Sequence, residues 1–372
     1  MPTAVAGGAP AGMDQGNSGG TNPFWQVTQL YARKNKQGAV SGQVLDANTH
    51  DGGGAIDAVG FQRGLRLQCR TSAAGSPTGV PAADNPGNFF KQLGLQNTDG
   101  TEIQQNLIGG YAHLQKYRAF RPWLRDPMTA YDYAQSLNPS ITYFLQAETR
   151  QQQAVLENTD TRQQYSWTHT INTQTALGIT GGTGPTVAVT PYVDVWAQPD
   201  VADLEGVENE RIPPGVNFQT KVRHYTFTLA AAGADNPLLS PLTGNALRGL
   251  VLIVRDSNLA RQDYIGNPLL WQLDDRTLST VDVDVYLQWA EDFYASFQGP
   301  GRPPRPTGVY FFPRFYNFGA MYGQGWLYTS NATSNLLEFS TIATAANLPG
   351  TVELIQEEVY NVGAIDTNLL DL

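Results

Sequence analysis

The sequence predicts an all-β protein made of two tandem β-sandwiches, with one helical excursion in each half. Three observations support this fold class. Only 15% of the 372 residues are charged, while glycine (38) and proline (23) are abundant, which is typical of short strands joined by many turns. Residues 222–229 alternate polar and apolar side chains, which indicates a strand with one buried face. Landmarks of the first half also recur, in the same order, in the second half.

Composition and charge exclude several classes of protein. Lys and Arg number 23 against 33 Asp and Glu, a formal charge of −10, whereas proteins that coat nucleic acid are basic. We therefore expect no extensive direct binding of nucleic acid. The single cysteine, Cys69, excludes an intrachain disulfide framework and a cysteine-based zinc site. We also expect no membrane-spanning segment and no secretion signal, because the apolar runs are too short.

The N-terminal residues 1–24 are predicted to form a flexible arm. They are rich in Gly, Ala, Ser and Asn and contain too few apolar side chains to offset the entropy of ordering. Phe24 and Trp25 mark the start of the globular region. A small basic cluster follows, which we interpret as a solvated loop, with a phosphate or lipid-headgroup contact as the alternative. The cluster consists of Arg33, Lys34 and Lys36.

The internal repeat begins with a strand-like segment. Residues 63–72 match residues 248–257 at a constant offset, sharing Arg, Gly, Leu, Leu, Arg and Ser. About two dozen residues later, Gln92-Leu93 corresponds to Gln272-Leu273. Each of these matches is weak by itself, but their shared order indicates a duplication.

A helix is predicted next in each half. In the first half it covers residues 126–138, with Asp126 as N-cap, Pro127 as first helical residue and Pro139 as the stop. In the second half it ends at Gly299-Pro300, and its apolar residues recur every four positions. These residues are Val285, Trp289, Phe293 and Phe297.

Two further strands close each copy. Residues 139–145 align with residues 306–312, and the strand entered by Gly184-Pro185 aligns with the strand entered by Pro349-Gly350. The acidic, proline-containing stretch 200–215 separates the copies and resembles a linker. We therefore place the first sandwich at residues 25–204 and the second at residues 205–372.

The sequence predicts no catalytic, cofactor-binding or metal-binding residue. The adjacent pairs Asp274-Asp275 and Glu357-Glu358 point to opposite faces of a strand, so we interpret them as solvated edge charges. Asp99 and Glu102 flank a glycine turn and leave calcium as a weaker alternative. The glycines from Gly319 to Gly325 lack the strand-to-helix context of a dinucleotide loop and indicate a tight turn.

Single nucleophiles and bases are expected to be structural. Cys69 and His224 lie inside strand patterns, which favours roles in the core, and the four histidines show no ligand-like spacing. They are His50, His113, His169 and His224. The aromatic residues concentrated between Trp271 and Trp326 favour core and subunit contacts over a sugar-stacking platform.

The chain resembles the double-jelly-roll major capsid proteins, and is most similar to those of tectivirus-like bacteriophages. The resemblance is carried by pattern rather than by one diagnostic motif and covers most of the chain beyond Phe24. The segments that carry it are 245–257, 267–273 and 306–313, with 63–72 and 98–101 in the first copy. The resemblance implies that each sandwich is a jelly roll.

The resemblance also implies a function without catalysis and without a cofactor. Three copies would form a pseudo-hexagonal homotrimer, and trimers would tile an icosahedral shell around the genome, in contact with penton or minor capsid proteins. The chain would reside in the virion and pass through the host cytoplasm during assembly. Tectivirus shells enclose a lipid membrane, but residues 1–21 lack the amphipathic periodicity of that family's arm, so shells with and without membrane both remain open.

Two alternatives belong to other classes. A jelly-roll scaffold can carry a carbohydrate-binding protein or a carbohydrate-active enzyme, which would need an aromatic platform beside spaced carboxylates. Another virion structural protein, such as a spike or penton, is also frequently a jelly roll, but it lacks a half-length repeat.

Overall fold

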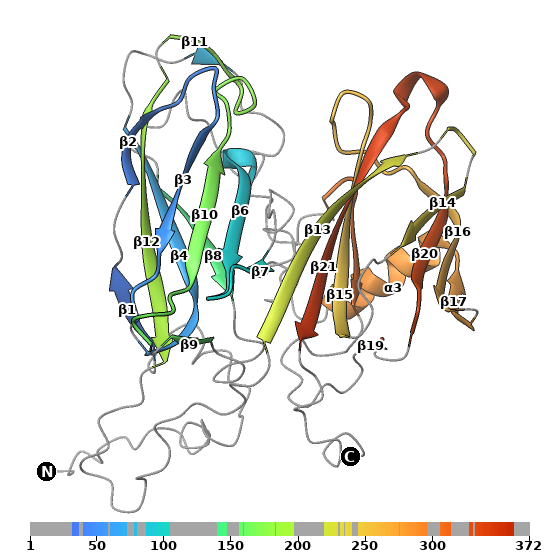
Figure 1. Cartoon of the computed structure of the whole chain (residues 1–372). Helices are drawn as coiled ribbons and strands as arrows, with labels where there is room; N and C mark the ends of the chain where they lie inside the picture. The colour runs from blue at the N-terminus through green and yellow to red at the C-terminus, as the bar shows by residue number, and fades with distance from the viewer. Residues whose placement is uncertain are drawn as a thin grey trace, which may run out of the picture.

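The computed structural model contains two β-sandwiches that stand side by side (Figure 1). The predicted arm (1–24), the first-half helix (126–138) and the boundary between residues 204 and 205 lie outside the described residues. The structure describes residues 32–36, 40–58, 60–72, 78–79, 87–104, 140–146, 156–158, 160–182, 184–196, 219–229, 231–233, 235–239, 245–274, 276–295, 306–313, 327–329 and 332–360.

The first sandwich contains strands β1 to β12. One sheet has the order β1-β12-β4-β8, with β2 and β9 pairing beside it, and the other side is formed by β7-β6-β10-β3. A small two-stranded sheet joins β5 and β11, and a 3₁₀ turn covers Gly87–Phe89. The strands are β1 (Ala32–Lys36), β2 (Val40–Val44), β3 (His50–Ala55), β4 (Gly60–Ser72), β5 (Thr78–Gly79), β6 (Phe90–Gln96), β7 (Glu102–Gln104), β8 (Ser140–Gln146), β9 (Leu156–Asn158), β10 (Ser166–Ile171), β11 (Ile179–Gly181) and β12 (Thr186–Trp196).

The second sandwich repeats this plan. Its strands run in the orders β13-β21-β15-β18, with β19 beside β15, and β14-β20-β16-β17. The helix α3 and a 3₁₀ turn at Ala345–Asn347 complete it. The elements are β13 (Gln219–Leu229), β14 (Asp235–Leu239), β15 (Ala246–Arg255), β16 (Ile265–Leu273), β17 (Arg276–Val281), α3 (Val283–Ala295), β18 (Val309–Pro313), β19 (Leu327–Tyr328), β20 (Asn335–Thr341) and β21 (Gly350–Tyr360).

The sequence repeat corresponds to equivalent strands. The order β1-β12-β4-β8 in the first sandwich matches β13-β21-β15-β18 in the second, and the hairpin β6–β7 matches β16–β17. The register agrees as well, because Leu65 pairs with Leu145 while its counterpart Leu250 pairs with Phe312. Two four-stranded sheets, formed twice along one chain, make a double jelly roll.

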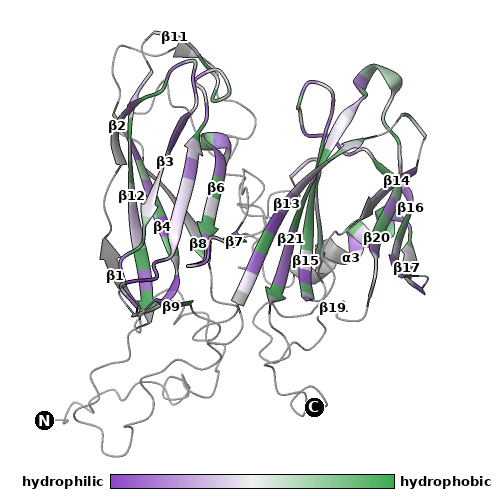
Figure 2. Ribbon diagram, in the orientation of Figure 1, coloured by the Kyte–Doolittle hydropathy of each residue, from purple (hydrophilic) through white to green (hydrophobic). Residues whose placement is uncertain are grey.

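Strand β15 is covered on both faces. All ten of its residues are buried, as its continuous apolar run predicts, and Figure 2 shows hydrophobic residues along it. Leu250 and Leu252 belong to the core of the second jelly roll. Val251 and Ile253 point to the opposite face and belong to the same apolar cluster as the core of the first jelly roll.

Helix α3 confirms the helix predicted in the second half. Val283, Tyr286 and Leu287 pack against the second core, whereas Val285 and Trp289 are 59% and 44% exposed. The Tyr286 ring stacks on Phe312 with ring centroids 4.8 Å apart, and its hydroxyl donates a hydrogen bond to the carbonyl oxygen of Phe311. Tyr286 therefore anchors the helix to β18.

Replacing Tyr286 by phenylalanine should lower the free energy of unfolding by about 0.5–1.5 kcal/mol, the usual net contribution of one hydrogen bond. The ring stacking on Phe312 is retained in this variant, so the change isolates the hydroxyl. Urea denaturation followed by tryptophan fluorescence measures the loss. An unchanged midpoint would contradict the anchoring role of the hydroxyl.

Candidate functional site

The two jelly rolls are joined strand to strand. Strand β7 of the first lies parallel to β13 of the second, with Gln104 opposite Val222, and both residues are fully buried. This pairing makes one nine-stranded sheet that runs through both sandwiches. The pairing covers the backbone edges of the two jelly rolls at the point where β7 meets β13 (Figure 1).

Apolar side chains seal one face of this junction. The outward face of the β13-β21-β15-β18 sheet contributes residues to the core cluster of the first jelly roll. They are Val222, Ala246, Val251, Ile253, Val309, Phe311, Ile355 and Val359. Because this apolar area is removed from water within one chain, the two jelly rolls form a permanent unit.

Charged side chains accompany the apolar ones on β21. The Glu353 Oε1 atom accepts a hydrogen bond from Arg255 Nε at 2.7 Å, and His224 Nε2 lies 3.8 Å from Glu353 Oε2, beyond hydrogen-bond distance. Burial favours the protonated form of Glu353, but His224 and Arg255 beside it hold the pKa of this carboxyl below its ordinary value. Glu353 therefore stays ionised at neutral pH, and its ion pair with Arg255 is retained.

Glu357 and Glu358 are completely enclosed, so their interpretation as solvated edge charges is wrong. Their strand, β21, is an inner strand between β13 and β15, and both faces of this sheet are packed: Ile355 and Val359 belong to the first apolar cluster, and Val352 and Leu354 belong to the second. Glu357 pairs with Arg248 at 3.1 Å, with both side chains buried. Glu358 accepts a hydrogen bond from Asn245 at 2.6 Å, but burial raises its pKa to about 7 against the opposing effect of this bond.

The first jelly roll has a counterpart of the Glu357 pair. Asp194 on β12 lies opposite Gly64, just as Glu357 on β21 lies opposite the equivalent Gly249. Asp194 is buried and accepts a hydrogen bond from Arg66 at 2.7 Å. Sequence reasoning missed these ion pairs; the available signal was an acidic residue near the end of the strand that closes each half.

The single nucleophiles and bases lie apart from one another. Cys69 is buried in β4, where burial raises the pKa of its thiol well above the ordinary value, so its prediction as a core residue is confirmed. His169 stacks on Trp167 in β10, and burial lowers its pKa to about 4. His224 lies in β13 as described above, and His50, the first residue of β3, lies 3.2 Å from Asp46 in the loop that leads into this strand. His113 lies outside the described residues.

The acidic turn residues serve as local caps. Asp99 Oδ1 accepts a hydrogen bond from the Thr101 amide at 2.8 Å, which lowers its pKa. Asp274 Oδ1 accepts bonds from both the amide and the hydroxyl of Thr333, and from the Ser334 amide. Each carboxylate therefore braces a turn. Asp275 and the glycines from Gly319 to Gly325 lie outside the described residues.

The basic cluster of the N-terminal region is part of a strand. Arg33, Lys34 and Lys36 belong to β1, which pairs with β12 from Ala32↔Trp196 to Lys36↔Tyr192. Their interpretation as a loop is therefore wrong. The alternation of polar and apolar residues around it was too short to indicate a strand.

Within the described ranges, no three His, Cys, Asp or Glu side chains are close enough together to hold a metal ion. No helix there has the length and apolar character needed to cross a membrane. The buried carboxylates of Asp194, Glu353 and Glu357 form ion pairs with arginines on neighbouring strands. What the arrangement provides is a rigid, permanently joined pair of sandwiches.

Exposed apolar side chains concentrate on one part of the second jelly roll. Among the described residues, six large hydrophobic side chains are exposed, and three of them fall in the segment 276–289 formed by β17 and the start of α3. They are Leu278, Val285 and Trp289. An apolar concentration of this kind is typical of a contact surface for another protein.

Comparison with known proteins finds similarity in fold but no match in sequence. No family model matches the sequence, and no curated protein matches it. Among solved structures, the chain is similar to a protein chain in the atomic structure of Sulfolobus Turreted Icosahedral Virus, with a TM-score of 0.61 and 13% identity over 91% of this chain and 97% of that one.

Two further solved structures are similar over nearly their whole length. The PBCV-1 virus capsid model gives a TM-score of 0.56 at 11% identity, covering 88% of this chain and 94% of that chain. The major capsid protein of bacteriophage PM2 gives 0.50 at 10% identity, covering 88% and 97%. The predicted all-β fold, with two tandem jelly rolls, is thus confirmed, and it is the fold of these viral major capsid proteins.

Proposed function

We propose that the chain is the major capsid protein of an icosahedral virus, with a structural rather than an enzymatic role. The observation that carries the proposal is the double jelly roll itself, which spans almost the full length of solved viral capsid proteins. The buried ion pairs agree with this role, because they join strands to one another and line no shared reaction centre.

We infer that the assembling unit is a homotrimer with a pseudo-hexagonal outline. Two equivalent sandwiches, which we place at residues 25–204 and 205–372, give each copy two similar sides, so three copies supply six. Such trimers would tile the shell of the virion after assembly in the host cytoplasm, with penton or minor capsid proteins completing it. A tectivirus-like bacteriophage is the source that the sequence pattern favours, and contact with an internal membrane is left to experiment.

The molecular mass of the purified protein tests this function. Sedimentation velocity and light scattering should give a species of three times the 40.5 kDa chain, and electron microscopy should show shells at assembly concentration. A chain that stays monomeric at every concentration and binds in a glycan screen would overturn the proposal in favour of a carbohydrate-binding protein.

Deleting residues 1–21 should leave the jelly rolls folded and reduce the yield of particles. This segment has too few apolar residues to contribute to either core, so its contribution is expected only in contact with neighbours or the particle interior. Circular dichroism and thermal melting report the fold, and electron microscopy reports the particles. A Gly/Ser segment of the same length is the control. Unfolding of the deletion variant would contradict the assignment as an arm.

A further inference from the structure

The edge strand β3 of the first jelly roll has no apolar side chain in the core. It pairs along its whole length with β10 and is the last strand of its sheet (Figure 1). None of its six residues belongs to the apolar cluster, whereas Leu45 before it and Ile56 after it are fully buried. A segment with few buried apolar contacts opens more easily than the core around it. Residues 50–55 can therefore separate from β10 while both ends of the segment stay anchored.

Two glycines of β3 lie directly against β10. A Cβ atom at Gly52 would be 2.4 Å from Cε1 of His169, and a Cβ atom at Gly53 would be 2.3 Å from the carbonyl oxygen of Trp167. Gly53 also has a φ of +154°, which other residues rarely adopt. Because no side chain fits at these two positions, the backbone of β3 itself covers the ring of His169.

The imidazole of His169 lies in an aromatic site. Its ring stacks on Trp167 with centroids 5.1 Å apart, and it meets the Phe90 ring edge-on at 5.5 Å. The residue is only 2% exposed, and its Nδ1 atom has no hydrogen-bond partner within the described ranges. A neutral imidazole tolerates this site, whereas an imidazolium would hold a charged N–H group without an acceptor.

Asp51 is the charged group that acts on this ring. Its carboxylate favours the protonated form of His169, but burial outweighs it and lowers the pKa of His169 from 6.5 to about 4. Asp51 is exposed, and its Oδ1 atom accepts a hydrogen bond from the Thr170 hydroxyl at 2.6 Å. The carboxylate is therefore engaged on the solvent side of the sheet rather than beside the ring.

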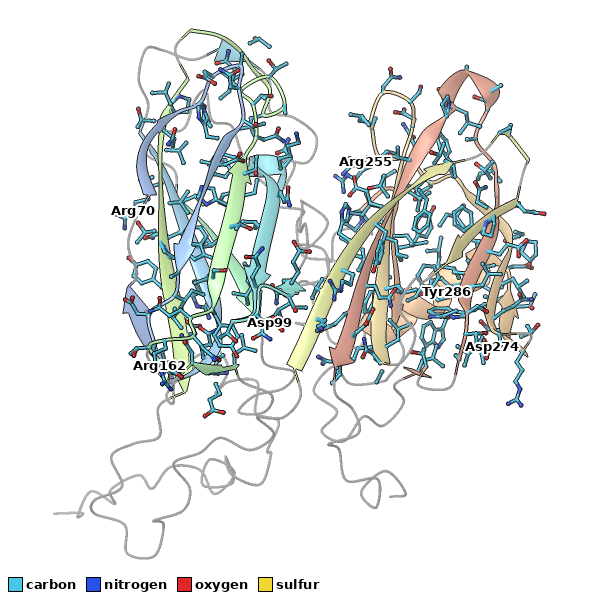
Figure 3. All side chains as sticks on the ribbon, viewed as in Figure 1. Arg70, Asp99, Arg162, Arg255, Asp274 and Tyr286 are labelled. Carbon is cyan, nitrogen blue, oxygen red and sulfur yellow. The ribbon has the colours of Figure 1, made fainter. Side chains whose placement is uncertain are left out.

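The other titratable groups of the surrounding strands have partners or lie in solvent. His50, at the start of β3, is 3.2 Å from Asp46, and Lys91 on β6 is exposed. Cys69 on β4 faces the same core, but burial keeps its thiol neutral. Arg162, in the turn before β10, is bound to Asp160 and lies at the lower end of the first jelly roll (Figure 3).

We propose that His169 is an acid-sensitive switch for the edge strand β3: the neutral ring keeps the strand closed, and protonation of the ring opens it. Opening removes the cover at Gly52, so that the charged imidazole reaches water. The backbone edge of β10 is exposed at the same time and becomes free to pair with another strand. The switch is a property of the folded chain and goes beyond the proposed capsid function, which does not depend on it.

The direction of the pH effect follows from proton linkage. Above pH 6.5 the ring is neutral in both the closed and the open form, so pH has no effect. Between pH 6.5 and 4 the open form binds a proton that the closed form does not bind, so opening increases as the pH falls. With an ordinary pKa of 6.5 in the open form, the opening equilibrium at pH 5 should be about 30 times that at pH 8.

Hydrogen exchange of the full chain, read by mass spectrometry of its peptides, tests the switch. Protection factors, which correct for the pH dependence of the intrinsic exchange rate, should fall about 30-fold in residues 50–55 between pH 8 and pH 5, and far less in β4. His169→Gln, whose side chain does not titrate, should abolish this fall. His50→Gln is the matched control and should retain it, because His50 lies on β3 itself but is partly exposed.

Gly52→Ala should reproduce the acid effect at neutral pH. Its added Cβ atom would displace the ring of His169, so residues 50–55 should lose about tenfold or more in protection at pH 8. Circular dichroism verifies that each variant is folded. If His169→Gln does not fold, the unaltered chain and Gly52→Ala still decide the question.

Four results would overturn the switch. The protection of residues 50–55 in the unaltered chain could be independent of pH, or the fall could persist in His169→Gln. Equal losses in β3 and β4 would show that the whole jelly roll opens rather than its edge. Unchanged protection of Gly52→Ala at pH 8 would show that the contact between Gly52 and the ring does not hold the strand. The particle mass tests the capsid function separately, so these results leave that function intact.

Discussion

Replacing Arg248 by methionine is expected to destabilise the protein by about 3–5 kcal/mol, the usual cost of leaving one member of a buried ion pair alone. Arg248 and Glu357 are 3% and 0% exposed and lie 3.1 Å apart, so no water can replace the lost guanidinium. The carboxylate would remain charged in an apolar junction, or would have to take up a proton. Urea denaturation at a fixed protein concentration measures the loss, since assembly also contributes to apparent stability.

The double variant Arg248→Met with Glu357→Met provides the decisive comparison. Because both charges are removed together, most of the lost stability should return. Arg162→Met removes an exposed partner of Asp160 and should leave the urea midpoint unchanged. If the single Arg248 variant unfolds at the midpoint of the unaltered protein, the pair makes no net contribution and the argument from burial is wrong.

Replacing Glu358 by glutamine is expected to remove a pH dependence of about 3 kcal/mol, which follows from its raised pKa. The folded protein raises the pKa of Glu358 from its ordinary 4.5 to about 7, chiefly by burial. Below pH 4.5 the group is protonated in both states and contributes nothing. Between pH 4.5 and 7 the folded state holds a proton that the unfolded state has released, so stability falls as the pH rises.

The comparison therefore has a definite sign. At pH 4 the glutamine variant and the unaltered protein should be equally stable, and at pH 8 the variant should be the more stable. Glutamine can still accept the hydrogen bond from Asn245, but it loses the bond that Gln356 donates to the other carboxylate oxygen, a loss that protonated Glu358 shares. Glu157→Gln, an exposed position on β9, is the control and should show no such crossover. A constant difference across the pH range would show that folding leaves the pKa of Glu358 at its ordinary value.

Much of the fold could be predicted because each matching segment of the repeat is a short stretch of adjacent residues. The match of residues 63–72 with 248–257 identifies two equivalent strands, and the alignment of residues 139–145 with 306–312 gives their neighbours in the correct register. Periodicity at Val285 and Trp289 likewise identifies α3, because a helical pattern depends only on nearby residues. Local signals of this kind can be recognised without any knowledge of the tertiary structure.

The burial of the charges could not be predicted in this way. Glu357-Glu358 reads as solvated because the sequence gives no sign that β13 and β15 enclose β21. The junction between β7 and β13 joins residues more than a hundred positions apart, and no pattern in either strand specifies that they meet. The burial of Glu357 and Glu358 depends on how the two sandwiches pack together. The sequence shows only that these side chains are polar.

The pairing of β7 with β13 also bears on aggregation. An unpaired strand offers its free amide and carbonyl groups to any other strand, which is the usual start of edge-to-edge aggregation. Each jelly roll made separately would present such an edge, whereas in the joined chain β7 covers part of the edge of β13. Strand β17 keeps its edge open, and it is short, with Arg276, Thr277, Ser279 and Thr280 along it. Short length and polar side chains are features that protect an edge strand against indiscriminate pairing.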